Sequence, residues 1–184
     1  MQVCSTRDHS VRLSFSDSLL AGLPPGGGLY QPDPPPDLHQ LIASLPERAS
    51  FQEVATAITN NIFEEELQPS TDGWLLAADA LVQEAFPFSP ALRWLNDDIV
   101  LLELFHGPSG AFKDFGASFL ATLLEHQLCL GSCGNKVVVL VATSGDTGGA
   151  VARAFWRRRG IEVVLLYPSG RISHLQEQQL TTLG

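Results

Sequence analysis

Cysteine is scarce in this sequence of 184 residues, which has only Cys4, Cys129 and Cys133. No two of them form a Cys-x-x-Cys pair, and three cysteines cannot all pair with one another. A disulfide framework and a zinc site with cysteine ligands are therefore not indicated. A reducing compartment fits this cysteine usage best.

Long hydrophobic runs are also missing. The longest, residues 137–142 and 163–167, have the length of strands, whereas a bilayer-spanning helix needs about 20 apolar residues. The N-terminus lacks the apolar stretch of a signal peptide, because Arg7, Asp8 and His9 come too early. These absences predict a cytoplasmic protein without a membrane span.

Positive charge is in short supply. Lysine and arginine together number 11, against 20 aspartate and glutamate residues, so the formal charge is −9. An acidic surface repels the phosphates of nucleic acids and anionic membranes, and we expect neither as a partner. An anionic small molecule would need a local group of hydrogen-bond donors, because the net field does not attract it.

The composition is that of a globular protein, with 45% hydrophobic and 17% charged residues. Residues 1–96 combine short helical patterns with proline-rich turns, and we predict a small helical N-terminal region there. Residues 97–184 alternate apolar strands with helices, which predicts the first part of an α/β domain with a parallel sheet. No internal repeat is present.

The N-terminal region contains one strong helix signal. Ser50 and Glu53 have the spacing of a capping box, and apolar residues follow at helical spacing. Residues 16–23 have a short amphipathic pattern, and residues 31–37, with four prolines, predict an extended connector. The acidic residues 64–66 are interpreted as a solvated face. Asp72 is predicted to cap a further helix with inward-facing Trp74, Leu75, Ala78, Leu81 and Val82.

The second region follows the pattern of a parallel α/β sheet. Its nearly unbroken apolar strands are typical of a sheet covered on both faces. Residues 136–167 are predicted to form one right-handed βαβ unit. The predicted strands are residues 99–105, 136–142 and 161–167, and the predicted helices are residues 114–128, 150–159 (ended by Gly160) and 172–183.

Lys113 is the first candidate for chemistry. It lies between a predicted strand and the helix after it, where ligands bind in open α/β sheets. The positive end of the helix dipole and apolar neighbours both disfavour its ammonium form. A lysine that loses its proton easily can form a Schiff base with an aldehyde. On spacing alone, a solvent-facing lysine in a first helical turn remains the commoner alternative.

The second candidate is the polar loop of residues 142–149, which joins a buried strand to a helix. The hydroxyls of Ser144 and Thr147, together with free amides at a helix start, can bind a carboxylate or a phosphate. The loop lacks the Gly-Lys-Ser/Thr ending of a Walker A motif and is not a Gly-x-Gly-x-x-Gly fingerprint. A capped turn without a ligand stays open as an alternative.

A third loop, residues 168–173, also follows a strand, and its Arg171 could meet an anion. By itself it is a weak signal, because such segments are more often only turns. Three loops after parallel strands gather at one sheet edge, however, and would bring a lysine, hydroxyls and free amides together.

Four ordered segments resemble the threonine synthase family of fold-type II pyridoxal-phosphate enzymes, which is related to the tryptophan synthase β subunit. The resemblance runs nearly end to end. Its segments are Ser5-Thr6-Arg7 with residues 15–31, the lysine segment 105–115, the Thr-Ser-Gly-Asp-Thr-Gly loop within residues 142–149, and residues 168–184.

The resemblance implies the tryptophan synthase β-like fold, pyridoxal 5′-phosphate as cofactor, and conversion of O-phospho-L-homoserine and water to L-threonine and phosphate. Lys113 would hold the cofactor and then shuttle protons at Cα and Cβ of the substrate. Asp146 matches the position that approaches the cofactor's 3′-oxygen. The substrate's anionic groups would be bound by Ser144, Gly145, Thr147 and Gly148.

The sequence departs from the family pattern in two ways. Ser109-Gly110 stands where relatives often have a larger pair. The family's glycine-rich loop for the cofactor phosphate, and the polar partner of the pyridine nitrogen, would lie beyond Gly184. We therefore expect a fragment that binds the cofactor poorly on its own and has little or no turnover.

Two other functions remain open. Another fold-type II lyase, such as a serine or threonine dehydratase or a cysteine synthase, is disfavoured by the opening segment. An assay of phosphate release against keto-acid formation would separate the two readings. A non-catalytic binding or signalling remnant is the third reading, and an activity that survived Lys113→Ala would exclude Schiff-base chemistry. Oligomeric state does not follow from the sequence.

Overall fold

The computed structural model describes residues 1–64, 77–130 and 136–183. The chain divides into two compact units, Met1–Val82 and Gln83–Gly184. The predicted boundary between residues 96 and 97 concerns where a catalytic domain begins and stays a prediction. Within the described ranges, no helix is both long and apolar enough to cross a membrane.

The first unit contains a small antiparallel sheet that the sequence did not predict. Strand β1 (Gln2–Ser5) lies between β2 (Arg12–Ser14) and β3 (Tyr30–Pro32). These strands have three or four residues each, too few to show an alternating pattern. The predicted extended connector after Gln31 thus begins inside an edge strand, where a proline is tolerated because one side needs no ladder bond.

Residues 5–7 fix the glycine-rich turn that follows α1. The Arg7 side chain donates from Nη1 to the Gly26 carbonyl at 3.0 Å, and the Thr6 hydroxyl accepts from the Leu29 amide at 3.0 Å. Gly28 has φ +93°, and a Cβ there would lie 2.9 Å from the Thr6 hydroxyl. The opening segment therefore contributes a packed turn, and glycine is required in it both for conformation and for space.

The helices of the first unit are α1 (Phe15–Ala21), α2 (His39–Ser44) and α3 (Phe51–Ile62). The capping box predicted before α3 is confirmed. The Ser50 hydroxyl accepts from the Glu53 amide at 3.2 Å, and the Glu53 carboxylate accepts from the Ser50 amide at 2.7 Å. The helix predicted from Asp72, with Trp74 and Leu75, begins outside the described residues. Its remainder, α4 (Ala78–Ala85), does bury the predicted Ala78, Leu81 and Val82.

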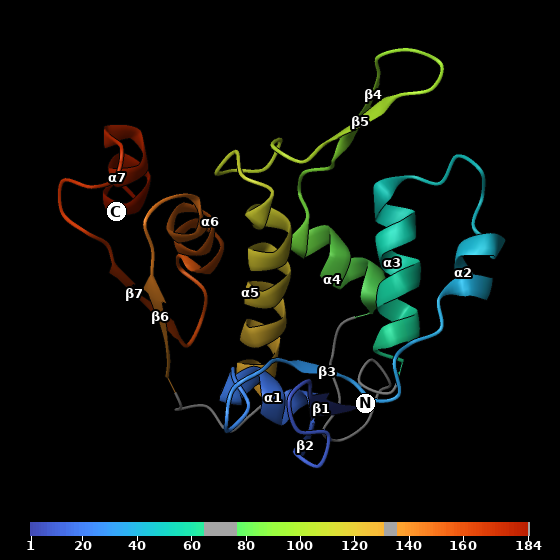
Figure 1. Ribbon diagram of the computed structural model, residues 1–184, viewed down its shortest axis with the longest axis horizontal. Helices are drawn as coiled ribbons and strands as arrows, with labels where there is room; N and C mark the ends of the chain where they lie inside the picture. The colour runs from blue at the N-terminus through green and yellow to red at the C-terminus, as the bar shows by residue number, and fades with distance from the viewer. Residues whose placement is uncertain (65–76, 131–135, 184) are drawn as a thin grey trace. The chain divides into compact units, whose positions relative to one another are not determined.

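The first predicted strand of the second unit has a different partner from the one expected. Strand β5 (Val100–Glu103) pairs antiparallel with β4 (Ala91–Trp94), and this hairpin projects from the helices of its unit (Figure 1). It does not join the parallel sheet, so the prediction of three parallel strands was wrong on this point. Strands β4 and β5 are joined by a short connection and pair with each other. A parallel partner would have required a longer crossover connection.

The predicted βαβ unit is confirmed. Strands β6 (Val137–Ala142) and β7 (Ile161–Leu166) are parallel and joined by α6 (Asp146–Phe155), and α5 (Lys113–Leu130) precedes them. The prediction placed the connecting helix too late, because α6 begins within the polar loop and ends four residues before residue 159. Gly160, at φ +73°, therefore belongs to the turn into β7 and does not end the helix. The last helix is α7 (His174–Thr181), shorter than predicted.

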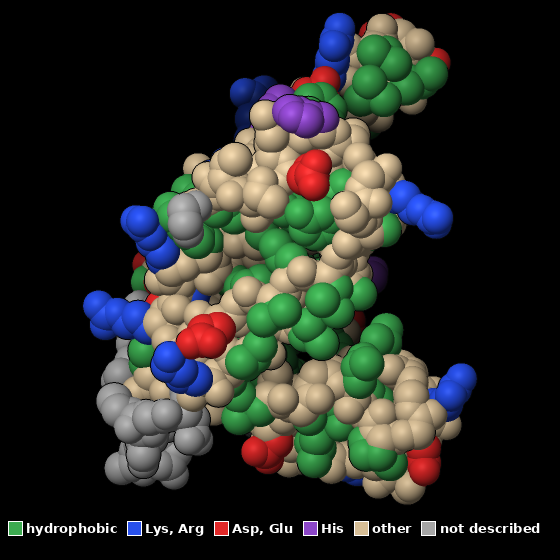
Figure 2. Space-filling view, turned by 90° about the vertical axis from the view of Figure 1, so that its left-hand side faces the viewer, with side chains coloured by type: hydrophobic (Ala, Val, Ile, Leu, Met, Phe, Trp, Pro, Cys, Tyr) green, Lys and Arg blue, Asp and Glu red, His purple; other side chains and the backbone are tan. Residues whose placement is uncertain are grey.

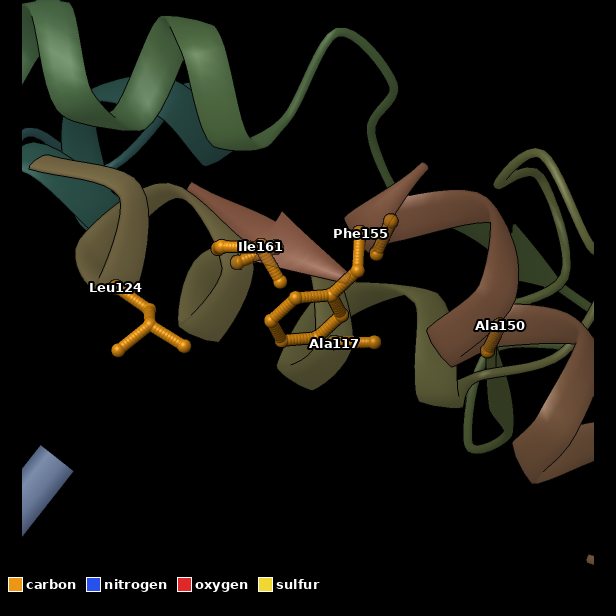
Figure 3. Close-up of a cluster of buried hydrophobic side chains, with 7 residues drawn as sticks. Ala117, Leu124, Ala150, Phe155 and Ile161 are labelled. Carbon is orange, nitrogen blue, oxygen red and sulfur yellow. The ribbon is translucent and has the colours of Figure 1, made fainter. Parts of the chain in front are cut away.

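The core of this second unit lies between α5, α6 and β7 (Figure 3). Phe155 is its largest fully buried side chain and lies among small residues of the two helices. Small residues allow the helices to approach closely, and α5 and α6 pack along much of their length. The cluster consists of Ala117, Ala121, Leu124, Ala150, Ala154, Phe155 and Ile161.

Among the described residues, only one face of the parallel pair is covered. Val139 and Val163 pack against the core, whereas Leu140 and Val164 on the opposite face are 64% and 42% exposed. The expectation of a sheet covered on both faces is therefore wrong for the part of the chain that the structure describes. Figure 2 views the side where α7 and β7 lie in Figure 1, and hydrophobic side chains are exposed on it.

One arginine connects α4, α5 and the turn after α6. Arg158 donates from Nη1 to Glu84 at 2.5 Å and to Glu125 at 2.8 Å, and Glu125 also accepts from the Arg159 amide at 2.7 Å. His126 contacts Glu84 at 3.1 Å. Arg158 and Glu125 are mostly buried, so these charge-assisted bonds are only weakly screened by solvent.

Candidate active site

The loop before α5 is folded tightly around a buried carboxylate. Asp114 is 1% exposed, and its Oδ2 accepts from the Ser109 amide at 2.9 Å. A Cβ at Gly107 would lie 2.4 Å from the same oxygen, so only glycine fits there. The other oxygen, Oδ1, is buried and has no partner among the described residues. Asp114 thereby fixes the loop that ends at Lys113.

Lys113 is the first residue of α5, and its side chain is half-buried. Its Nζ lies 4.5 Å from the centre of the Phe112 ring, and it makes no hydrogen bond or ion pair with any described residue. The amine is therefore free to react with a ligand. Its predicted easy loss of a proton stays a prediction.

The other lysine of the sequence, Lys136, has a different environment. Its Nζ lies 2.7 Å from Glu162, and both side chains are exposed. The hydrogen bond to Glu162 raises the pKa of Lys136, and the pKa of Glu162 is correspondingly lowered. Lys136 is thus a natural reference amine for Lys113, because it is held in its charged form.

Thr143 organises the turn between β6 and α6. Its hydroxyl accepts from the amides of Gly145 (3.2 Å) and Gly148 (2.9 Å) and donates to the Gly145 carbonyl at 3.1 Å. A Cβ at Gly148 would lie 2.3 Å from the Thr143 methyl group, so the turn closes only over a glycine. Thr143 itself is 9% exposed.

This turn leaves donors free at the N-terminus of α6. Within the described part of the chain, the amides of Ser144, Asp146 and Thr147 have no acceptor, and neither have the hydroxyls of Ser144 and Thr147. All three residues are exposed. Free amides and the positive end of the helix dipole together make a site that can bind an anion, as predicted.

The lysine and the turn line one cavity of about 410 Å³. Lys113, Ser144, Gly145, Asp146 and Thr147 all contribute to it, so the structure brings together most of the predicted site residues. Gly148 does not line the cavity, because it lies buried beneath the turn with its amide already donated. Its predicted role in substrate binding stays a prediction, and its observed role is packing.

The third predicted loop contributes in an unexpected way. Arg171 is exposed and is not among the residues that line the cavity. Gln176, two residues beyond the start of α7, lines it instead and donates from Nε2 to Asp146 Oδ1 at 3.0 Å. Gln179 reaches the other loop and donates to the Ser109 carbonyl at 3.2 Å.

Sequence reasoning missed Thr143, Asp114 and the two α7 glutamines. Thr143 and Asp114 adjoin the predicted residues in the sequence. Each packs against a nearby glycine, Thr143 against Gly148 and Asp114 against Gly107. A buried polar residue paired with a nearby glycine was the available signal. The glutamines gave no signal, because glutamine on a polar helix normally faces water.

This arrangement can hold a carbonyl compound that carries an acidic group. The free amine of Lys113 can condense with an aldehyde. The amides and hydroxyls of residues 144–147 can bind a carboxylate or phosphate in the same cavity. A lysine facing an anion site is the combination required for chemistry on an amino-acid substrate through a carbonyl cofactor.

Comparisons with known proteins agree with the resemblance seen in the sequence. The family described as "Threonine synthase N terminus" matches residues 2–72. The threonine synthase of Haemophilus influenzae is 38% identical over 186 residues, which cover 100% of this chain and 40% of that protein.

Two solved structures are similar to the whole fold. The crystal structure of Escherichia coli threonine synthase has a TM-score of 0.80 at 36% identity, covering 100% of this chain and 41% of that one. The structure of PLP-bound threonine synthase from Brucella melitensis has a TM-score of 0.81 at 35% identity, covering 97% and 38%. The chain is therefore similar to threonine synthases along nearly its whole length and spans about two-fifths of the length of these relatives.

Proposed function

We propose that this chain carries the lysine and the anion-binding turn of a threonine synthase that uses pyridoxal 5′-phosphate. The observation that supports this most directly is the shared cavity of Lys113 and residues 144–147. The donor set fits the cofactor and its substrate, because a free amine can take up the aldehyde and free amides can bind anionic groups. Homology to threonine synthases, one of them PLP-bound, supports the same function.

When bound, pyridoxal phosphate would supply an electron sink for carbanions at the substrate's Cα and Cβ. Lys113 would hold the cofactor through its amine and afterwards accept and return protons at those two carbons. Ser144, Gly145 and Thr147 would bind the anionic groups of O-phospho-L-homoserine. Asp146, at the edge of the cavity, would approach the cofactor's 3′-oxygen.

Hydrogen bonds within the turn and the lysine loop hold this site in position before any ligand binds. Thr143 fixes the turn with three hydrogen bonds, and Asp114 fixes the lysine loop, so neither needs to be ordered on binding. Donors held in position lower the entropic cost of binding an anion.

Selective labelling of Lys113 tests the proposal on the chain itself. The protein is incubated with pyridoxal phosphate and borohydride, and the modified peptides are quantified by mass spectrometry. The two lysines differ in their surroundings, since Lys136 is held by Glu162. We expect severalfold more modification at Lys113 than at Lys136, and equal modification of both would contradict the proposal.

The reaction is tested in a chimaera in which this chain replaces the matching two-fifths of the E. coli enzyme. Phosphate release from O-phospho-L-homoserine, with threonine as product, is the expected result. Lys113→Ala should abolish it, whereas Lys136→Ala should leave it intact. Keto-acid formation from L-serine or L-threonine, with no phosphate release from O-phospho-L-homoserine, would indicate a dehydratase instead.

A further inference from the structure

Two glutamines of α7 each hold one loop of the cavity. We propose that Gln176 and Gln179 act together as a clamp that sets the position of Lys113 relative to the anion-binding turn. The importance of this position for catalysis rests on the function proposed above. Both are positioning residues, since they act through Asp146 and Ser109 and not on the reacting atoms.

Gln176 is held in one orientation. Its Oε1 accepts from the Ser173 amide at 3.2 Å and from the Ser173 hydroxyl at 3.0 Å, which completes the capping box of α7. The Nε2 group is therefore directed at Asp146, with a distance of 3.0 Å to Oδ1. A Cβ at Gly145 would lie 2.7 Å from this nitrogen, so the turn approaches the glutamine closely.

Gln179 makes the second contact of the clamp. Its Nε2 donates to the Ser109 carbonyl at 3.2 Å, and the Ser109 amide in turn donates to Asp114, which is next to Lys113. The Gln179 Oε1 lies 3.1 Å from the position of a Cβ at Gly149, in the first turn of α6. The side chain thus fills the space between the lysine loop and α6.

The spacing of the two glutamines explains how one short helix can reach both loops. Residues three apart lie on the same face of a helix, so both side chains extend to the same side of α7. Within the described residues, no hydrogen bond joins residues 107–113 directly to residues 143–147. Polar contact between the two loops therefore runs through α7.

Hydrogen exchange tests the clamp without any cofactor. The reporters are the amides of Gly148, in the turn, and Ser109, in the lysine loop, and the reference is the Val137 amide, which donates to Gly160 at 2.8 Å. In a Gln176→Glu, Gln179→Met double variant we expect both reporters to exchange about fivefold to tenfold faster, the effect of losing roughly one hydrogen bond.

Matched controls separate the clamp from general effects on α7. Glu at position 176 can still form a capping box but cannot donate to Asp146. Gln178 is exposed and lies between the two glutamines, so Gln178→Glu and Gln178→Met make the same chemical changes outside the clamp. Unchanged exchange in the double variant, or equally faster exchange in the controls, would overturn the proposal.

Labelling with pyridoxal phosphate then tests the function of the clamp. The ratio of modification at Lys113 to that at Lys136 should fall severalfold in each of Gln176→Glu and Gln179→Met, and stay constant in the Gln178 variants. A purely structural role would lower the free energy of unfolding without changing this ratio, and that result would overturn the positioning role.

The two proposals fail in different ways. If the unaltered chain shows no preference for Lys113, the proposed function fails, while hydrogen exchange still decides whether the clamp exists. If the unaltered chain prefers Lys113 and the α7 variants keep that preference, only the clamp fails.

Discussion

The hydroxyl of Thr143 makes three hydrogen bonds in the turn before α6. Thr143→Val keeps the shape of the side chain but leaves the buried Gly148 amide with a longer contact to the Gly145 carbonyl (3.1 Å) as its remaining bond. We expect a loss of about 1–3 kcal/mol in the free energy of unfolding, which urea denaturation measures.

Thr143→Ser is the control for this variant, because serine retains the hydroxyl and loses only the methyl group. The serine variant should keep most of the stability and all of the selectivity of labelling at Lys113. If the serine variant loses stability and the valine variant does not, the methyl group and not the hydroxyl holds the turn.

At the scale of single residues, the sequence predicted where most of the candidate site residues lie. Lys113, Ser144 and Thr147 line one cavity as expected, because strand–loop–helix order places such residues at strand ends. The substrate-binding role of Gly148 stays a prediction, and in the structure this residue is buried under Thr143. Only the three-dimensional distance to the threonine methyl shows that glycine serves packing there.

The capping box of α3 supports a prediction about a whole element. Ser50→Ala removes the acceptor for the Glu53 amide at the start of this helix. We expect a cost of about 1 kcal/mol in the free energy of unfolding. Glu53→Gln, which can still complete a capping box, should cost less, and equal costs would show that the carboxylate charge matters as much as the Ser50 hydroxyl.

The connection of α4 and α5 through Arg158 predicts a pH dependence. Burial alone raises the pKa of Glu84, but the hydrogen bonds from His126 and Arg158 outweigh it, so the pKa lies below its ordinary value. A lowered folded-state pKa stabilises the protein above the unfolded pKa of about 4.3, and this stabilisation is lost as the pH falls through the folded value.

Glu84→Gln tests this dependence by urea denaturation across pH. The Glu84 side chain is 39% exposed, so solvent screening limits the expected loss at pH 7 to about 1 kcal/mol. Once the pH has fallen below the lowered folded-state pKa of Glu84, the variant and the unaltered chain should become equally stable. A difference that persists at low pH would assign the loss to packing instead of charge.

At the scale of elements, the sequence predicted what periodicity and capping encode. The βαβ unit and α3 were predicted because long apolar strands and a capping box are local signals. The sheet of β1, β2 and β3 was missed because its short strands pair across the chain. The β4–β5 hairpin was missed because a single strand pattern does not identify its partner.

At the scale of the whole molecule, the uncovered face of the β6–β7 sheet exposes apolar side chains to water. Leu140 and Val164 are exposed there, and exposed apolar patches bind hydrophobic dyes and promote association. Leu140→Thr with Val164→Thr should reduce dye fluorescence and increase solubility with little change in the free energy of unfolding, since threonine also favours strands.

Val139→Thr is the matched control on the opposite face. Val139 is partly buried and packs against the core cluster, so a hydroxyl there should destabilise the protein by about 1 kcal/mol. If the two faces respond alike, the distinction between a covered and an uncovered face is wrong.

Helix α5 also provides two labelling positions at a fixed distance for an energy-transfer measurement. It carries Lys113 at its first residue and the exposed Cys129 near its last, about 24 Å apart at the usual helical rise. Cys4 is buried, so a thiol-reactive dye can be directed to Cys129 once Cys133 is replaced by serine. Energy transfer along this helix would then report optically, in real time, on whichever chromophore occupies the amine at its other end.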